Sequence, residues 1–125
     1  TQRDALGVNE LGFWAARQGF IQKNRAALVD FTEDMMRIVR WYLAPANHKA
    51  AVEIAAKITK QPAASFDDWL FTDKDYYRDL NMVPNLDALN ANLKLTQELG
   101  FLKSAIDIKQ YADLSIVQEA AKRQR

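Results

Sequence analysis

The chain has 125 residues, of which 49% are hydrophobic and 26% charged, a balance typical of one small globular domain with a single core. The net charge of +1 argues against nucleic acid as a partner, because phosphates call for a concentrated basic face. Cysteine is absent, which excludes disulfides and cysteine-ligated metals, and no apolar run approaches the ~20 residues that span a bilayer.

Residues 1–20 predict a polar turn followed by one strand. Gly7 and Asn9 favour the turn. Residues 11–16 form a short apolar run that contains aromatics and has no helical stripe, so we expect a buried strand that ends near Gly19. A single strand cannot satisfy its own backbone hydrogen bonds, and the remaining sequence supplies no sheet. This strand therefore indicates that part of the protein lies elsewhere.

Residues 21–125 predict a helical part. Asn24 is a suitable N-cap for a first long helix, which Pro45 ends. An apolar stripe at spacings of three and four is expected to face the core. It consists of Leu28, Phe31, Met35, Ile38 and Tyr42, broadened by Val29, Met36 and Val39. Asn47 can cap a second helix over residues 48–59. Four residues of that helix are expected to point inward: Ala51, Ile54, Ala55 and Ile58.

Three shorter stretches complete the expected helices. Pro62 suits the first position of a third helix that runs through Trp69. After an irregular stretch over residues 71–84, Asn85 caps a leucine-rich helix, and Gly100 ends it.

The final helix is expected to begin near Asp113 or Ser115. Ser115 and Gln118 match a capping box, in which each side chain would satisfy a backbone N–H of the first turn. Residues 122–125 are expected to fray. The predicted fold class is therefore mostly α, with four to five helices after one N-terminal strand.

The sequence contains no catalytic constellation, and no cofactor or metal is predicted. His48 is the sole histidine and has no second His or Cys to join it, which predicts a surface histidine. The densest acidic stretch lacks the spacing and central glycine of a calcium loop, so we expect solvated carboxylates or helix caps. Its members are Asp67, Asp68, Asp73, Asp75 and Asp79. Tyr76 and Tyr77 are candidates for an interface or a pocket rim.

Two residues are candidates for ligand binding. Asn9 and Glu10 stand just before the predicted strand, and clefts form where strands and loops meet at the edge of an open sheet. The amide of Asn9 can both donate and accept hydrogen bonds, which suits an oxyanion or an amide. The alternative for both residues is a plain polar turn.

The order of several segments resembles the C-terminal part of the solute-binding proteins of ABC importers in the nitrate/sulfonate/taurine and thiamine-precursor group. An apolar stretch is followed by a Lys-Asn step, a long helix with a late Trp-Tyr pair, an Ala-rich helix, a Glu-Leu-Gly-Phe helix end and a Leu-Ser-Ile-Val finish. These segments lie at residues 11–20, 23–29, 37–43, 50–56, 98–101 and 113–120.

The resemblance covers about residues 8–121 and implies one segment, residues 1–125, of a two-lobed α/β periplasmic-binding-protein fold of type II. Residues 1–20 would form a return strand near the hinge, and residues 21–125 a helical part. The implied function is to capture an oxyanion, a sulfonate or a thiamine-precursor-like molecule between the lobes and deliver it to the ABC permease. The parent protein would be exported to the periplasm or anchored outside the cytoplasm.

Two other functions remain open. A fungal branch that resembles the family makes the thiamine pyrimidine with pyridoxal phosphate and a histidine, but His48 lies on a predicted helix away from the strand. A stand-alone helical interaction module would need a complete core within these residues, and the unpaired strand argues against it. If the chain folds alone, an exposed apolar patch and a homodimer are expected.

Overall fold

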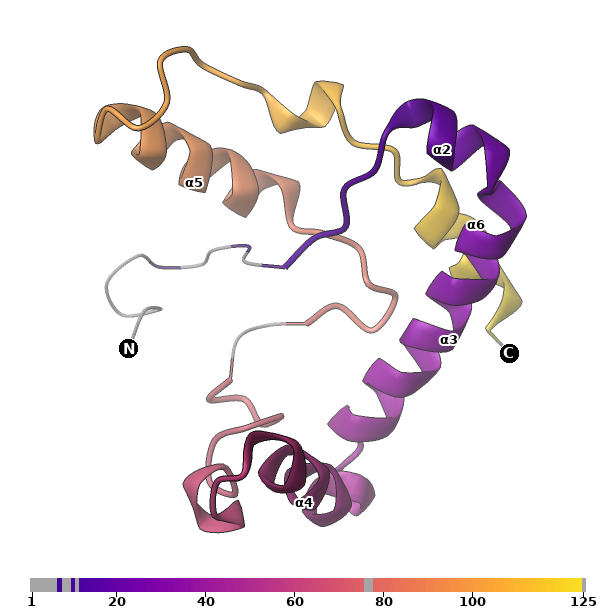
Figure 1. The fold of residues 1–125 in the computed structure, drawn as a ribbon, viewed down its shortest axis with the longest axis vertical. Coiled ribbons are helices and arrows are strands. Elements are labelled where there is room, and N and C mark those ends of the chain that lie inside the picture. The colour runs from indigo at the N-terminus through magenta and orange to yellow at the C-terminus, as the bar shows by residue number, and fades with distance from the viewer. Residues whose placement is uncertain (1–6, 8–9, 11, 76–77, 125) are drawn as a thin grey trace.

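The computed structural model describes residues 7, 10, 12–75 and 78–124 (Figure 1). Within these residues the chain forms five α-helices: α2 Gln18–Lys23, α3 Arg25–Leu43, α4 His48–Thr59, α5 Leu86–Glu98 and α6 Ser115–Arg123. Three short 3₁₀ helices lie between them: η1 Pro45–Asn47, η2 Ala63–Ser65 and η3 Ile108–Gln110. The expected helical character is confirmed, and none of the described helices is long and apolar enough to cross a bilayer.

The predicted strand is wrong for the residues that the structure describes. Residues 12–17 have no regular secondary structure, and α2 begins at Gln18, before the expected end of the strand at Gly19. Leu11 lies outside the described residues. No strand occurs in the described part of the chain, so this apolar run has no sheet to join, and its Trp14 ring contacts Phe31 of α3 instead.

The helices form an open arrangement rather than a closed bundle. Figure 1 shows α3 and α6 side by side, α4 across the C-terminal end of α3, and α5 apart from them on the other side of the N-terminal segment. The chain exposes 9290 Å² of surface. A compact monomer of 14.3 kDa exposes about 6,800 Å². Much surface is therefore left uncovered, and it includes large apolar side chains such as Trp14, Ile58 and Phe101.

The core lies where α3 meets α6. Val29, Met36 and Ala120 are fully buried there, and Met82, Ile116, Val117 and Ala121 pack against them. The buried face of α3 therefore differs from the expected one. Val29, Met36 and Val39, which were expected at its edge, are the buried residues. Phe31 and Ile38 remain exposed, since α6 is a single short helix that covers only the Val29–Met36 side of α3.

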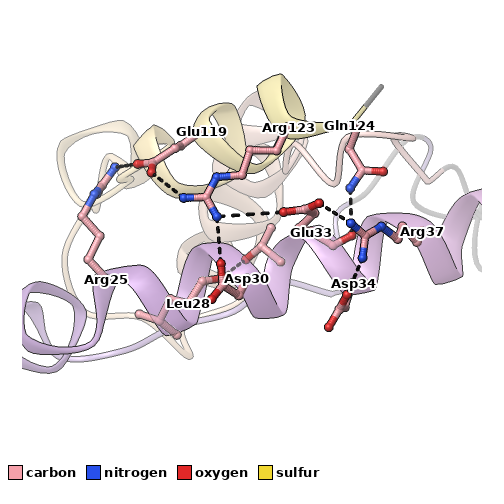
Figure 2. A network of polar contacts seen from close by, with 10 residues as sticks. Arg25, Leu28, Asp30, Glu33, Asp34, Arg37, Glu119, Arg123 and Gln124 are labelled. Atoms are coloured by element: carbon pink, nitrogen blue, oxygen red, sulfur yellow. Dashed lines mark hydrogen bonds and ion pairs between the residues drawn. The ribbon is translucent and has the colours of Figure 1, made fainter.

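Charged side chains extend the contact between α3 and α6 (Figure 2). Arg123 donates to Asp30 at 2.8 Å and to Glu119 at 3.2 Å, while Arg25 donates to Glu119 at 2.8 Å and to the Ser115 hydroxyl at 2.9 Å. The expected fraying is thus wrong for the start of the tail, because Lys122 and Arg123 are helical and Gln124 donates to the carbonyl of Glu33. Exposed ion pairs of this kind each contribute about 0–1 kcal/mol, so the apolar core remains the main stabilising contact.

The second helix has the predicted bounds, but its inward face is partly wrong. Ala51 and Val52 are buried on α4, whereas Ile54 and Ile58 are exposed. Ala51 and Ile54 are three residues apart and were expected on one buried face of α4. The described chain places no element over the part of that face that carries Ile54 and Ile58. The third predicted helix is reduced to η2 and a series of turns over residues 66–72.

Asn24, Asn47 and Asn85 stand at the predicted N-cap positions of α3, α4 and α5, but of the three only Asn85 makes a side-chain cap hydrogen bond. The Asn85 side chain accepts from the N–H of Ala88 at 3.0 Å. The side chain of Asn24 instead donates to the carbonyl of Phe20, and that of Asn47 donates to the carbonyl of Trp41. Both amides thus bond to a preceding carbonyl rather than to the N–H groups of the helix that follows.

The capping box at the start of α6 is also wrong. The Ser115 side chain makes no cap hydrogen bond, because its hydroxyl accepts from Arg25. Asp113 takes the expected place by accepting from the N–H of Ser115 at 2.9 Å. An aspartate just before a helix satisfies a backbone donor in the same way as a serine cap.

Gly100 ends α5 as predicted, with φ of 80°. The N–H of Phe101 donates to the carbonyl of Thr96 at 3.0 Å and that of Gly100 to the carbonyl of Gln97 at 2.9 Å, which is a Schellman motif. No atom lies within 4 Å of a Cβ built at Gly100. We therefore expect Gly100→Ala to lower the free energy of unfolding by about 1 kcal/mol, from backbone strain alone.

Urea unfolding followed by circular dichroism tests this value. Gly100→Asn is the matched variant, because asparagine tolerates the left-handed region better than alanine and should recover part of the loss. Equal losses for both variants would contradict the assignment to backbone strain.

Candidate functional site

A groove of about 760 Å³, which we call the α3 groove, lies in the described part of the chain. Its walls come from four regions that are distant in sequence: residues 12–16, the α3 face, residues 78–84, and residues 113–117 at the start of α6. Pockets of about 300–1,000 Å³ with mainly apolar walls are typical of small-molecule sites. The α3 groove has the size and lining expected of such a site.

Aromatic side chains form one wall of the α3 groove. Trp14 and Phe31 meet edge to face, with ring centroids 5.4 Å apart and planes at 88°. Phe13 and Phe20 lie beside them in the lining, and Trp14 is 74% exposed. Phe31 was expected in the core, but it lines the α3 groove instead. Aromatic rings that stay exposed in a groove can stack on a ligand.

Two lining residues of the α3 groove, Tyr42 and Arg78, belong to a cluster that includes a buried carboxylate. The guanidinium of Arg78 lies 5.7 Å from the ring centroid of Tyr42 and 5.5 Å from that of Phe71. Asp75 accepts from Arg78 at 2.7 Å and from the N–H of Phe71 at 2.9 Å. The cluster fixes Phe71 at φ of 61°, a conformation that costs a bulky residue free energy and persists only when its surroundings hold it.

The prediction that Asp75 is a solvated loop carboxylate is wrong, since only 8% of the residue is exposed. A signal was present in the sequence, because Arg78 follows at a spacing of three and aromatic residues precede the pair and lie between its two members. That spacing alone does not distinguish a buried pair from an exposed one.

Three carboxylates lie along the lining of the α3 groove. Glu10 accepts from the N–H of Asn85 at 2.8 Å, and Asp79 accepts from the N–H of Asn81 at 2.8 Å. Asp113 also lines the groove, and hydrogen bonds from the hydroxyl and the N–H of Ser115 lower its pKa. The Arg78 guanidinium is already held by Asp75, so the groove favours a neutral or cationic guest over an anion.

Of the two predicted ligand residues, the structure describes only Glu10. Asn9 lies outside the described residues. Glu10 is brought to the wall of the α3 groove, where its side chain also anchors the N-terminal segment to the start of α5 and its carbonyl accepts from Asn92 at 2.9 Å. The structure thus gives Glu10 a clear structural contact, and its role toward a ligand stays a prediction.

Of the other candidates, His48 does not line the α3 groove. His48 is partly exposed, and its Nε2 atom lies 2.8 Å from the carbonyl oxygen of Asp67. Tyr76 and Tyr77 are outside the described residues. Among the residues that the structure places, no group of three or more His, Cys, Asp and Glu side chains could hold a metal ion.

Comparison of this chain with family models, with curated proteins and with solved structures finds no match.

Proposed function

We propose that this chain is the C-terminal part of a solute-binding protein of an ABC importer, in which a small molecule binds in the α3 groove. The observation that carries the proposal is the groove itself, a hollow of about 760 Å³ with an aromatic wall. One of its walls is formed by residues 12–16, which belong to the region that the resemblance to this family puts near the hinge.

The uncovered surface supports the two-lobed part of the proposal. The 9290 Å² exposed by the chain exceeds the surface of a compact monomer of its mass by about a third. In a two-lobed protein a second lobe would close over part of this surface, and closure about a hinge would bury the ligand. The permease would then receive the ligand when the lobes reopen.

The charges that line the α3 groove predict which class of ligand binds more tightly. Carboxylates at Glu10, Asp79 and Asp113 disfavour nitrate and sulfonates at this wall. A flat aminopyrimidine of the thiamine-precursor kind carries N–H donors for carboxylates and a ring face for Trp14 and Phe31. We therefore expect the aminopyrimidine class to bind ahead of the oxyanions.

A thermal-melt ligand screen tests the proposed function. The protein is produced with the residues encoded before Thr1, and the panel holds nitrate, bicarbonate, taurine, longer alkanesulfonates, aromatic carboxylates and aminopyrimidines. A ligand at 100 times its Kd stabilises the folded state by about 2.7 kcal/mol, a rise in Tm on the order of 10 °C. Phe31→Ala should abolish most of that rise, because it removes the ring that faces Trp14.

Phe101→Ala is the matched control, since Phe101 is 81% exposed and does not line the α3 groove. It should leave the ligand-induced rise unchanged. A reading frame that starts just before Thr1 and encodes no α/β half would overturn the assignment to a solute-binding protein. A rise that survives Phe31→Ala would place the ligand outside the α3 groove.

A further inference from the structure

Residues 12–16 form one wall of the α3 groove without any regular secondary structure, and we call this segment the strap. Figure 1 shows the chain here running from beside the start of α5 to α2. All five residues line the groove, yet all five are also exposed to solvent. The strap is therefore a wall of the groove that no other described element buries.

Few interactions hold the middle of the strap in place. Residues 13–16 make no hydrogen bond with any part of the chain that the structure describes. Trp14 meets Phe31 edge to face, with 5.4 Å between the ring centroids, but keeps 74% of its surface exposed. An aromatic pair of this kind shifts an equilibrium by only about 2- to 12-fold. Segments with few buried contacts and no hydrogen bonds of their own open most readily from a fold.

Both ends of the strap, in contrast, are fixed. Before it, Glu10 accepts from the N–H of Asn85 at 2.8 Å, and the carbonyl oxygen of Glu10 accepts from the Asn92 side chain at 2.9 Å. After it, the carbonyl oxygen of Arg17 accepts from the N–H of Phe20 at 2.9 Å, where α2 begins. Loops that close over binding sites have the same plan, in which a few residues at the ends absorb the movement of the stretch between them.

We infer that the strap is a lid over the α3 groove, which swings outward to admit a ligand and closes when Trp14 packs against Phe31. Glu10 is a positioning residue of this lid, because its two hydrogen bonds fix the end from which the strap swings. That the lid encloses a ligand rests on the proposed function. The opening itself takes place in the ligand-free chain and is measured there.

Native-state proteolysis of the full chain with chymotrypsin tests the opening, and mass spectrometry follows the cut after Phe13 or Trp14. A protease cuts a segment that has come away from the fold, so the rate follows the open fraction of the strap. Phe31→Ala should raise the rate about 2- to 12-fold, because it removes the ring that holds Trp14. Ile38→Ala is the matched control on the same helix, similarly exposed but outside the groove, and it should leave the rate unchanged.

Glu10→Ala tests the fixed end of the strap. It should raise the rate of the same cut about tenfold, since it removes a charged acceptor from the N–H of Asn85. Glu10→Gln keeps an acceptor oxygen and should bring the rate back to within about threefold of that of the unmodified chain. Circular dichroism should show unchanged helix content in each variant, which separates opening of the strap from unfolding of the whole chain. Rates for Phe31→Ala and Glu10→Ala that equal the rate for Ile38→Ala would overturn the inference.

The same cut, measured with 4-aminopyrimidine, distinguishes failure of the lid from failure of the proposed function. At 100 times its Kd this probe should slow the cut about a hundredfold, because it binds the closed form. A rise in Tm without slower cleavage would overturn the lid and leave the proposed function standing. No rise in Tm would count against the proposed ligand class alone, and the rates of the ligand-free variants would still decide whether the strap opens.

Discussion

Asp75→Ala is expected to lower the free energy of unfolding by about 3 kcal/mol. The carboxylate is 8% exposed, and it accepts from the Arg78 guanidinium and from the N–H of Phe71. Its removal leaves the half-buried Arg78 without its carboxylate and frees Phe71 from the left-handed conformation that the hydrogen bond supports. The loss of the ion pair and the release of Phe71 affect the same cluster, so together they should give one large decrease in the free energy of unfolding.

Urea unfolding of the Asp75→Ala chain measures this loss. Asp73→Ala is the matched control, because Asp73 is an exposed aspartate in the same loop, and its effect should stay within about 0.5 kcal/mol. The double variant with Asp75→Ala and Arg78→Met should be more stable than Asp75→Ala alone, since it also removes the half-buried cation that the carboxylate paired with. Equal effects of Asp75→Ala and Asp73→Ala would contradict the buried cluster.

Met36→Ala is expected to lower the free energy of unfolding by about 2–5 kcal/mol. Met36 has no exposed surface and sits between Val29 and Ala120 in the core that joins α3 to α6. Truncation removes apolar burial and leaves a cavity that one short helix cannot close. Because the free energy of unfolding of a small domain is only about 5–15 kcal/mol, this change alone should remove a large share of it.

Two control substitutions on α3 separate the effect of lost volume from the effect of position. Met36→Leu keeps the volume and should cost less than about 1.5 kcal/mol. Ile38→Ala lies two residues away on the exposed side, and its effect should be far smaller than that of Met36→Ala. Chemical unfolding at fixed pH measures all three, and a loss for Ile38→Ala as large as that for Met36→Ala would place the core on the wrong face of α3.

The helices were predictable because their signals are local. The bounds of α4, the Asn85 cap and the Gly100 stop each depend on a few neighbouring residues, and the structure confirms all three. The faces of the helices were less predictable, because Phe31 and Ile54 have the same periodicity as buried residues. Which apolar residue becomes core depends on the element that packs against it, and α6 follows α3 by some ninety positions.

The strand was wrong, and the α3 groove was not predictable, for the same reason. An apolar run such as residues 12–16 becomes a strand only where a partner strand exists, and the described chain offers none. The α3 groove joins four regions that no sequence spacing connects, so Glu10 was selected for its place before a strand rather than for the groove that it lines. The burial of Asp75 was not predictable because its two partners, Phe71 and Arg78, pack against Tyr42, which belongs to α3, distant in the sequence.

The pairing of α3 with α6 also determines the order of events during synthesis. The Val29–Met36 side of α3 finds its cover only when Ser115–Arg123 has been made, some ninety residues later. At about 5–20 residues per second, this side stays open for roughly 5–20 s on each translating ribosome. The nascent chain therefore carries an apolar helix that cannot yet fold against anything, and its yield in a cell should depend on chaperones that bind such helices before α6 emerges.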